Sequence, residues 1–326
     1  MRRFIPFIIA LGLVALLPLV SPSDFYINLA SQTAIAALMA LGLNILVGYA
    51  GLTSLGHAAF PGIAAYLVAW LSTRGGLGPG AAAVLAVAGT FLVAGLFGLL
   101  ALRATGLGFV MITMALCQIV WGAAYRWTSL TGGDNGLSGV PRPFGDLLDP
   151  TTFLWLCLIV LAVAIIQIGR FAESPLGAAL RGTRDQPRRM SALGYDVWRI
   201  RFVAWLVAAS WGAVAGLLYA WYHQFVSPHM LAVTASAEIL LMVVAGGAGT
   251  LAGPLLGAAL VVLLKNLASI WIDRWVMLLG ATFVFIVLMM PDGLAPGLIH
   301  LRERFRKRMS SPTITPPLAS QERIDG

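Results

Sequence analysis

The sequence predicts an all-α fold, a polytopic integral membrane protein with about ten transmembrane helices. Of its 326 residues, 59% are hydrophobic and only 10% are charged, whereas a soluble domain carries about 25% charged residues. Apolar runs repeatedly reach or approach the roughly 20 residues that a helix needs to span a bilayer. A β-barrel would instead show short segments of alternating hydrophobicity. Composition and run length together therefore favour a bundle of membrane helices.

Ten apolar segments are expected to be the spans. The first is alternatively a signal peptide, but Leu19–Pro22 offers a poor small-residue cleavage site, which favours a retained span. The third and the eighth span are interrupted or short, so each is alternatively re-entrant or broken. The expected spans are 4–20, 27–47, 54–72, 81–102, 106–124, 152–168, 202–222, 235–248, 251–267 and 275–290.

The basic residues indicate topology. The 21 Lys and Arg include two at 2–3, seven within 170–201 and five within 302–308. Short cytoplasmic segments collect Lys and Arg. With the N-terminus cytoplasmic, ten crossings place all three clusters on the cytoplasmic side, the C-terminus included. The net charge of +8 is thereby explained without nucleic acid, although Arg74, Arg126 and Arg142 fall on the outside.

Three further regions complete the expected organisation. A membrane domain over 1–300 contains an outside loop at 125–151 and an inside loop at 170–201. The outside loop is rich in Gly, Pro, Asp and Asn, and loops of this length are usually functional or disordered. The tail 301–326 is basic and then polar with prolines, which predicts disorder.

The stretch GYAGLTSLGHAAFPG at 48–62 breaks an otherwise apolar region. Glycine permits unusual backbone angles and close helix approach, and Pro61 removes a backbone donor. We therefore interpret it either as a discontinuous helix that lines a translocation pathway or as a tightly packed kink. The candidate pathway residues here are Gly51, Ser54, Gly56 and His57.

Glu238 is the other candidate pathway residue, because it stands in the apolar run SAEILLMVV. Ionisable groups within membrane spans are expensive and often mark pathways. The alternative is a carboxylate that favours a helix N-terminus near the interface. Lys265 stands near the end of a span, and we expect it to extend to the lipid headgroups.

Several kinds of site are absent from the sequence. The P-loop needs a lysine after glycine, yet the only lysines, Lys265 and Lys307, do not follow one. Cys117 and Cys157 lie in apolar runs and are expected to be small core residues. The four histidines lack metal-ligand spacing. We therefore expect no catalytic residues, no metal and no cofactor.

Five collinear motifs resemble those of branched-chain amino acid ABC transporter permeases of the LivM type. The first, GYAGLTSLGHAAFPGIAAYLVAWL, resembles the family's GYAGQ-S-LGHAAF-GIGAY signature. The resemblance is specific to the family and less specific to the substrate, because permeases for urea and other small amides look similar. The motifs lie at 48–71, 131–141, 174–196, 236–260 and 289–297.

The resemblance implies a permease subunit, itself no enzyme, of an ATP-driven importer in the bacterial inner membrane. The substrate would be a branched-chain or related hydrophobic amino acid, or alternatively urea or a short-chain amide. The implied partners are a second permease subunit of the LivH type, two cytoplasmic ABC ATPases, a periplasmic substrate-binding protein and membrane lipid. An alternative of another class is an ion-coupled secondary transporter, for which Glu238 would be the main ionisable candidate.

The segment 174–196 resembles the coupling loop that docks into the ATPase. The alternative is a basic loop held by anionic lipid. Where the family has an acidic, alanine-rich run, this chain has DQPRRMSALG, so the docking helix is expected to begin later and to face a more acidic groove. The candidate coupling residues are Ala179, Arg184, Asp185, Ala192 and Gly194.

Overall fold

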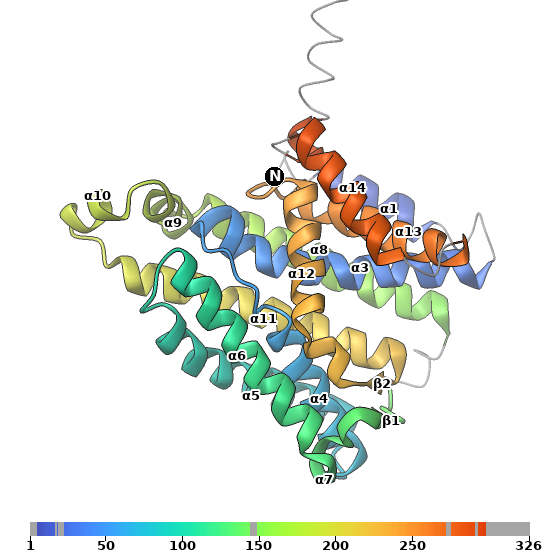
Figure 1. Ribbon diagram of the computed structural model, residues 1–326. Coiled ribbons are helices and arrows are strands. Elements are labelled where there is room, and N and C mark those ends of the chain that lie inside the picture. Colours follow the sequence, from blue (N-terminus) through green and yellow to red (C-terminus); the bar gives the residue numbers. More distant parts are fainter. Residues whose placement is uncertain are drawn as a thin grey trace, which may run out of the picture.

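The computed structural model describes residues 5–16, 18, 23–143, 149–271, 275–290 and 293–297, and the described chain is almost entirely helical (Figure 1). This confirms the all-α prediction. The basic residues at 2–3 and 302–308 and the tail 301–326 lie outside the described residues. The longer helices are α1 (Ile5–Ala15), α3 (Asp24–Asn44), α4 (Ala59–Thr73), α5 (Pro79–Ala101), α6 (Leu107–Arg126), α8 (Pro150–Glu173), α11 (Val197–His223), α12 (Val233–Gly246), α13 (Ala252–Trp271) and α14 (Trp275–Met289).

Each of the ten expected spans coincides with one of these helices, but their lengths differ. Within the described residues, five helical segments are long and apolar enough to cross a membrane: Asp24–Ala50, Pro79–Ala101, Leu107–Arg126, Pro150–Glu173 and Val197–His223. The 14 residues of α12 extend only about 21 Å, less than the roughly 30 Å of a hydrocarbon core. The number of crossings therefore stays a prediction.

The helix α3 lies at the centre of the bundle, and α5 and α6 lie at its outside. In an apolar stretch of 18 residues from each segment, 83% of the residues are buried within Asp24–Ala50, against 22% within α5 and within α6. The helix α5 packs through small residues four apart, which let helix backbones approach closely, and it exposes leucines and valines as a lipid-facing helix would. The packed residues are Ala82, Ala86, Thr90, Ala94 and Gly98.

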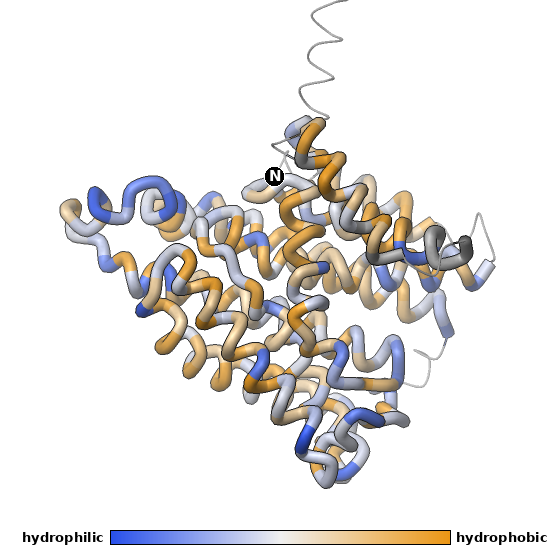
Figure 2. The backbone as a smooth tube through the Cα atoms, viewed as in Figure 1, coloured by the Kyte–Doolittle hydropathy of each residue, from blue (hydrophilic) through white to orange (hydrophobic). Residues whose placement is uncertain are grey.

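Hydrophilic segments gather at two ends of the molecule (Figure 2). One end holds the short helices α9 (Pro175–Asp185) and α10 (Pro187–Ala192), which begin with prolines at favourable first positions. The basic segment 174–196 therefore contains two short helices, the second of which begins at Pro187. The other end holds α7 (Thr128–Thr131), η2 (Gly133–Asn135) and β1 (Leu137–Ser138), which pairs antiparallel with β2 (Phe225–Val226).

The glycine-containing stretch does break a helix. The helix α3 continues as the π-helix η1 (Ile45–Ala50), which ends at Gly51 with φ +68°, an angle that favours glycine. Residues 51–58 then run into the bundle without forming a continuous helix, and α4 begins at Ala59 (Figure 1). A non-helical segment at membrane depth requires burial inside protein, and most of 51–58 is buried.

Candidate functional site

The broken segment 51–58 is held by hydroxyl groups that accept its backbone N–H groups. The Gly56 N–H donates to Ser54 Oγ at 3.2 Å. The Ala58 N–H donates to Ser236 Oγ of α12 at 3.1 Å. Because unpaired backbone groups are costly at membrane depth, these two serines make the break tolerable. Ser236 was not singled out by sequence reasoning.

Gly56 and His57 are packed solidly between helices. A Cβ on Gly56 would lie 2.1 Å from the carbonyl oxygen of Thr113 in α6, so only glycine fits there. The His57 ring is completely buried, lies against Gly42 of α3 and meets Phe60 edge-on with 5.5 Å between ring centroids. These contacts are those of a packed kink, and a pathway role for Gly51, Ser54, Gly56 and His57 stays a prediction.

The end of α3 meets the turn between α12 and α13 without room for a side chain. A Cβ on Gly48 would lie 2.3 Å from the Gly249 nitrogen. The fully buried Asn44 side chain accepts from Gly249 N–H at 2.8 Å and donates to the Thr250 carbonyl at 2.9 Å. Both partners of Asn44 are backbone groups, so the amide fixes the turn to α3.

Arg184 joins the short helix α9 to the same place. Its guanidinium donates to the Gly48 carbonyl, and its Cγ would lie 2.7 Å from a Cβ on Gly51. We call the set Asn44, Gly48, Gly51, Arg184 and Gly249 the glycine junction. Gly48 and Gly249, from the glycine-containing strings GYAGLTSLG and GGAGTLAGP, pack against each other there.

The other candidate coupling residues mostly face outward. Ala179 is half-buried, whereas Asp185, Ala192 and Gly194 are exposed. Gly194, in the turn after α10, has φ +86°, an angle that favours glycine. A Cβ at this position would have no other atom within 4 Å, so the backbone angle is one reason for glycine there. Sequence reasoning missed the large apolar side chains that the same tip exposes, Leu193 at 66% and Tyr195 at 49%.

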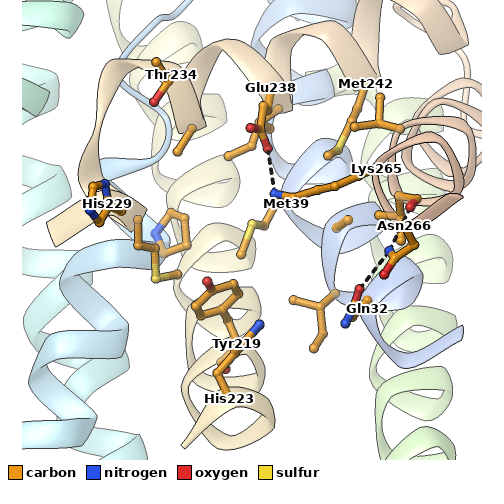
Figure 3. A pocket seen from close by; sticks show the side chains of 18 of the residues that line it. Gln32, Met39, Tyr219, His223, His229, Thr234, Glu238, Met242, Lys265 and Asn266 are labelled. Carbon is orange, nitrogen blue, oxygen red and sulfur yellow. Dashed lines mark hydrogen bonds and ion pairs between the residues drawn. The ribbon is translucent and has the colours of Figure 1, made fainter. Parts of the chain in front are cut away.

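A cavity of about 570 Å³ opens between α3, α11, α12 and α13, with Pro61 of α4 in its wall. Part of the lining is apolar, and Met39, Ile239 and Met242 contribute to it. The polar part contains Gln32, Tyr219, His223, Glu238, Lys265 and Asn266, whose side chains gather around the hollow in Figure 3.

Two polar pairs line this cavity. Lys265 Nζ lies 3.7 Å from Glu238 Oε2, and Asn266 Nδ2 donates to Gln32 Oε1 at 3.2 Å (Figure 3). Lys265 thus has a carboxylate neighbour on the adjacent helix, and its extension to the headgroups stays a prediction. Glu238 is the sixth residue of α12 rather than a residue of its first turn, so the helix N-terminus does not explain it.

The broken segment connects the glycine junction to the cavity. It leaves the junction at Gly51, and its far end is held by Ser236, which stands two residues before Glu238 on α12. Pro61, in the first turn of α4, is itself part of the cavity wall. One short stretch of backbone therefore runs from the junction to the cavity wall.

The remaining candidate groups are structural. Cys117 and Cys157 are buried free thiols, as expected of small core residues, and Cys117 Sγ donates to the Leu231 carbonyl at 3.2 Å. Within the described part of the chain, no three His, Cys, Asp or Glu side chains gather as metal ligands would.

Comparisons with known proteins agree on one family. A family model described as "Branched-chain amino acid transport system / permease component" matches residues 25–287. The high-affinity branched-chain amino acid transport system permease protein LivM of Salmonella typhimurium is 32% identical over 301 residues, which cover 83% of this chain and 70% of the relative. LivM of Escherichia coli is 32% identical over 322 residues, which cover 88% and 75%.

A more distant similarity extends to the second type of permease. The LivH protein of Escherichia coli is 22% identical over 143 residues, which cover 43% of this chain and 46% of the relative. No solved structure matches the chain.

Proposed function

We propose a transport route for this chain. The premise is that it belongs to the family of permease components of branched-chain amino acid transport systems. The resemblance seen in the five motifs is thereby confirmed. The chain is a multi-pass membrane permease of an ABC transport system and not itself an enzyme. The cavity and the glycine junction support inferences about its substrate, its transport route and its coupling to ATP hydrolysis.

The substrate we propose is a branched-chain or related hydrophobic amino acid, and the route is the cavity between α3, α12 and α13. Its volume of about 570 Å³ and its lining of apolar and polar side chains suit a small amphipathic molecule. Alternating access would open this cavity to one side of the membrane and then to the other. Urea and short-chain amides, the alternative substrates, would leave the apolar part of the lining without a partner.

The observation that carries the coupling proposal is the hydrogen bond from Arg184 to the Gly48 carbonyl. In this proposal α9 and α10 dock on a cytoplasmic ATPase, and ATP binding moves them. Arg184 passes the movement to the glycine junction, and the broken segment 51–58 passes it to the cavity wall at Pro61. The exposed Ala192, Leu193 and Tyr195 supply a surface for docking.

The assembly we propose has a second permease of the LivH type, two ATPases and a periplasmic binding protein, in a bacterial inner membrane. The relatives named LivM and LivH support two kinds of permease subunit. In this arrangement both termini and the loop 170–201 are cytoplasmic, and the loop 125–151 is periplasmic.

Co-purification tests the assembly. The tagged chain is expressed with the genes that neighbour its own, purified, and reconstituted in proteoliposomes with the binding protein. We expect ATPase subunits to be recovered and leucine uptake to require ATP. Uptake that is driven by an ion gradient, with no ATPase recovered, would instead identify a secondary transporter.

Ala192→Glu tests the docking surface. We expect the variant to insert normally but to lose ATP hydrolysis stimulated by the loaded binding protein, because the added carboxylate meets a groove shaped for a basic, small-residue surface. The same change at Gly194 is less informative, since a side chain at φ +86° strains the turn by itself. Ser129→Glu, at the opposite end, is the control. Normal stimulation in Ala192→Glu would place docking elsewhere.

A further inference from the structure

We propose that Glu238 and Lys265 form a subsite for the two charged groups of a zwitterionic amino acid. Glu238 would receive the α-ammonium group and Lys265 the α-carboxylate, while the substrate side chain lies on Met39, Ile239 and Met242. The proposal rests on the proposed function and adds which residues recognise the substrate and by what chemistry.

The first argument is the charge itself. An acid and a base inside a membrane domain are costly and are tolerated when paired or in contact with water. Here the two charged atoms are 3.7 Å apart, longer than the roughly 2.7–2.9 Å of a strong charge-assisted hydrogen bond. A zwitterion carries one complementary charge for each residue, so it can enter between them without leaving either charge uncompensated.

The second argument is access. The Lys265 and Glu238 side chains are 49% and 29% exposed, and both line the cavity. They come from α13 and α12, two helices joined by the turn at the glycine junction, and their charged ends point toward each other (Figure 3). A ligand in the cavity therefore meets both charges, and a movement of the turn changes their separation.

The third argument is the surface beside the charges. Ile35, Met39, Ile239, Met242 and Val261 line the same cavity and are each less than 10% exposed. Methionine is flexible and fills irregular spaces, so two methionines suit apolar side chains of different branching. Because the charged pair is neutral overall, the site favours neither a simple cation nor a simple anion.

The test uses the purified complex in proteoliposomes with a saturating amount of loaded binding protein. We expect Glu238→Gln and Lys265→Gln each to lower leucine uptake at least tenfold, while ATP hydrolysis stimulated by the binding protein stays within twofold of wild type. Asp24→Asn and Arg103→Gln remove one exposed charge each outside the cavity and serve as matched controls, with uptake within twofold of wild type.

A charge exchange separates recognition from simple structural pairing. The double variant Glu238→Lys, Lys265→Glu keeps an ion pair but reverses its polarity. We expect it to restore thermal stability to the wild-type value and to leave leucine uptake at least tenfold reduced, because the substrate then faces like charges. Restored uptake would mean that the pair is structural, and normal uptake in both single variants would equally overturn the subsite.

The proposed function and the proposed subsite can be refuted by different results. Wild-type complex that carries no branched-chain amino acid would refute that function. The subsite would survive this result only if wild-type complex carries another of the standard amino acids and the two single variants lower that uptake at least tenfold. If no zwitterionic amino acid is carried, both proposals are wrong.

Discussion

The glycine junction and the cavity occupy the two ends of the same helix pair, and they are built in opposite ways. At the junction, α3 and the α12–α13 turn meet so closely that a Cβ on Gly48 would lie 2.3 Å from Gly249. Farther along, a cavity of about 570 Å³ opens between α3, α11, α12 and α13, where Asn266 of α13 donates to Gln32 of α3. The close contact leaves no room for a larger residue, whereas the cavity leaves room for a ligand.

The largest expected effect comes from adding a single methyl group at the junction. Gly48→Ala forces the Gly249 backbone and the Asn44 amide away, so we expect a destabilisation of about 2–3 kcal/mol and loss of leucine uptake. Thermal unfolding of the purified complex and proteoliposome uptake measure both. The same change at Gly95 in α5, where nothing lies within 4 Å, should leave both properties intact. A fully active Gly48→Ala would break the contrast between the two ends.

Arg184→Ala should have the next largest effect, because it removes the hydrogen bond that joins α9 to the junction. We expect the variant to be inserted and to retain the ATPase on purification, while uptake per ATP hydrolysed falls roughly tenfold, about 1.4 kcal/mol. Arg103→Ala, another exposed arginine outside the junction, is the control. Unchanged coupling in Arg184→Ala would show that α9 transmits movement through other contacts.

A change of volume at the cavity should alter selectivity more than stability. Ala235→Leu adds three carbons to a wall that faces open space, so we expect thermal stability to change little. Uptake of leucine should fall several-fold more than uptake of valine, because leucine is larger by one methylene group. A difference of one methylene changes the discrimination between two substrates by about tenfold or more. Equal losses for both substrates would mean that the wall does not contact the substrate side chain.

The smallest expected effect is that of a topology probe. Ser138 and Ser191 are exposed at the two polar ends, so cysteine at either position should leave uptake unchanged. In a background without Cys117 and Cys157, we expect an impermeant thiol reagent to label position 138 from the periplasm and position 191 from the cytoplasm. Labelling of both from one side would refute the arrangement of the two ends.

Local sequence features determined much of this protein. Long apolar runs predicted the helices because a helix satisfies its own backbone in lipid, and all ten expected spans contain one. The two helices of the basic segment begin at Pro175 and Pro187, where proline suits the first helical position. The glycines and Pro61 predicted a break near 48–62, and the motif order predicted the family. Each of these features depends on residues close together in the chain.

Tertiary structure alone decided which distant segments meet. Gly48 and Gly249 are far apart in sequence, and no local preference says that their backbones touch or that Arg184 reaches the same carbonyl. Lys265 was expected at the headgroups because its own span ends there, yet Glu238 on the adjacent helix gives it a partner. The cavity forms between α3, α11, α12 and α13, with Pro61 in its wall, and a pathway role for Gly51, Ser54, Gly56 and His57 stays a prediction. Packing between whole helices sets those distances, and that information is spread over the entire chain.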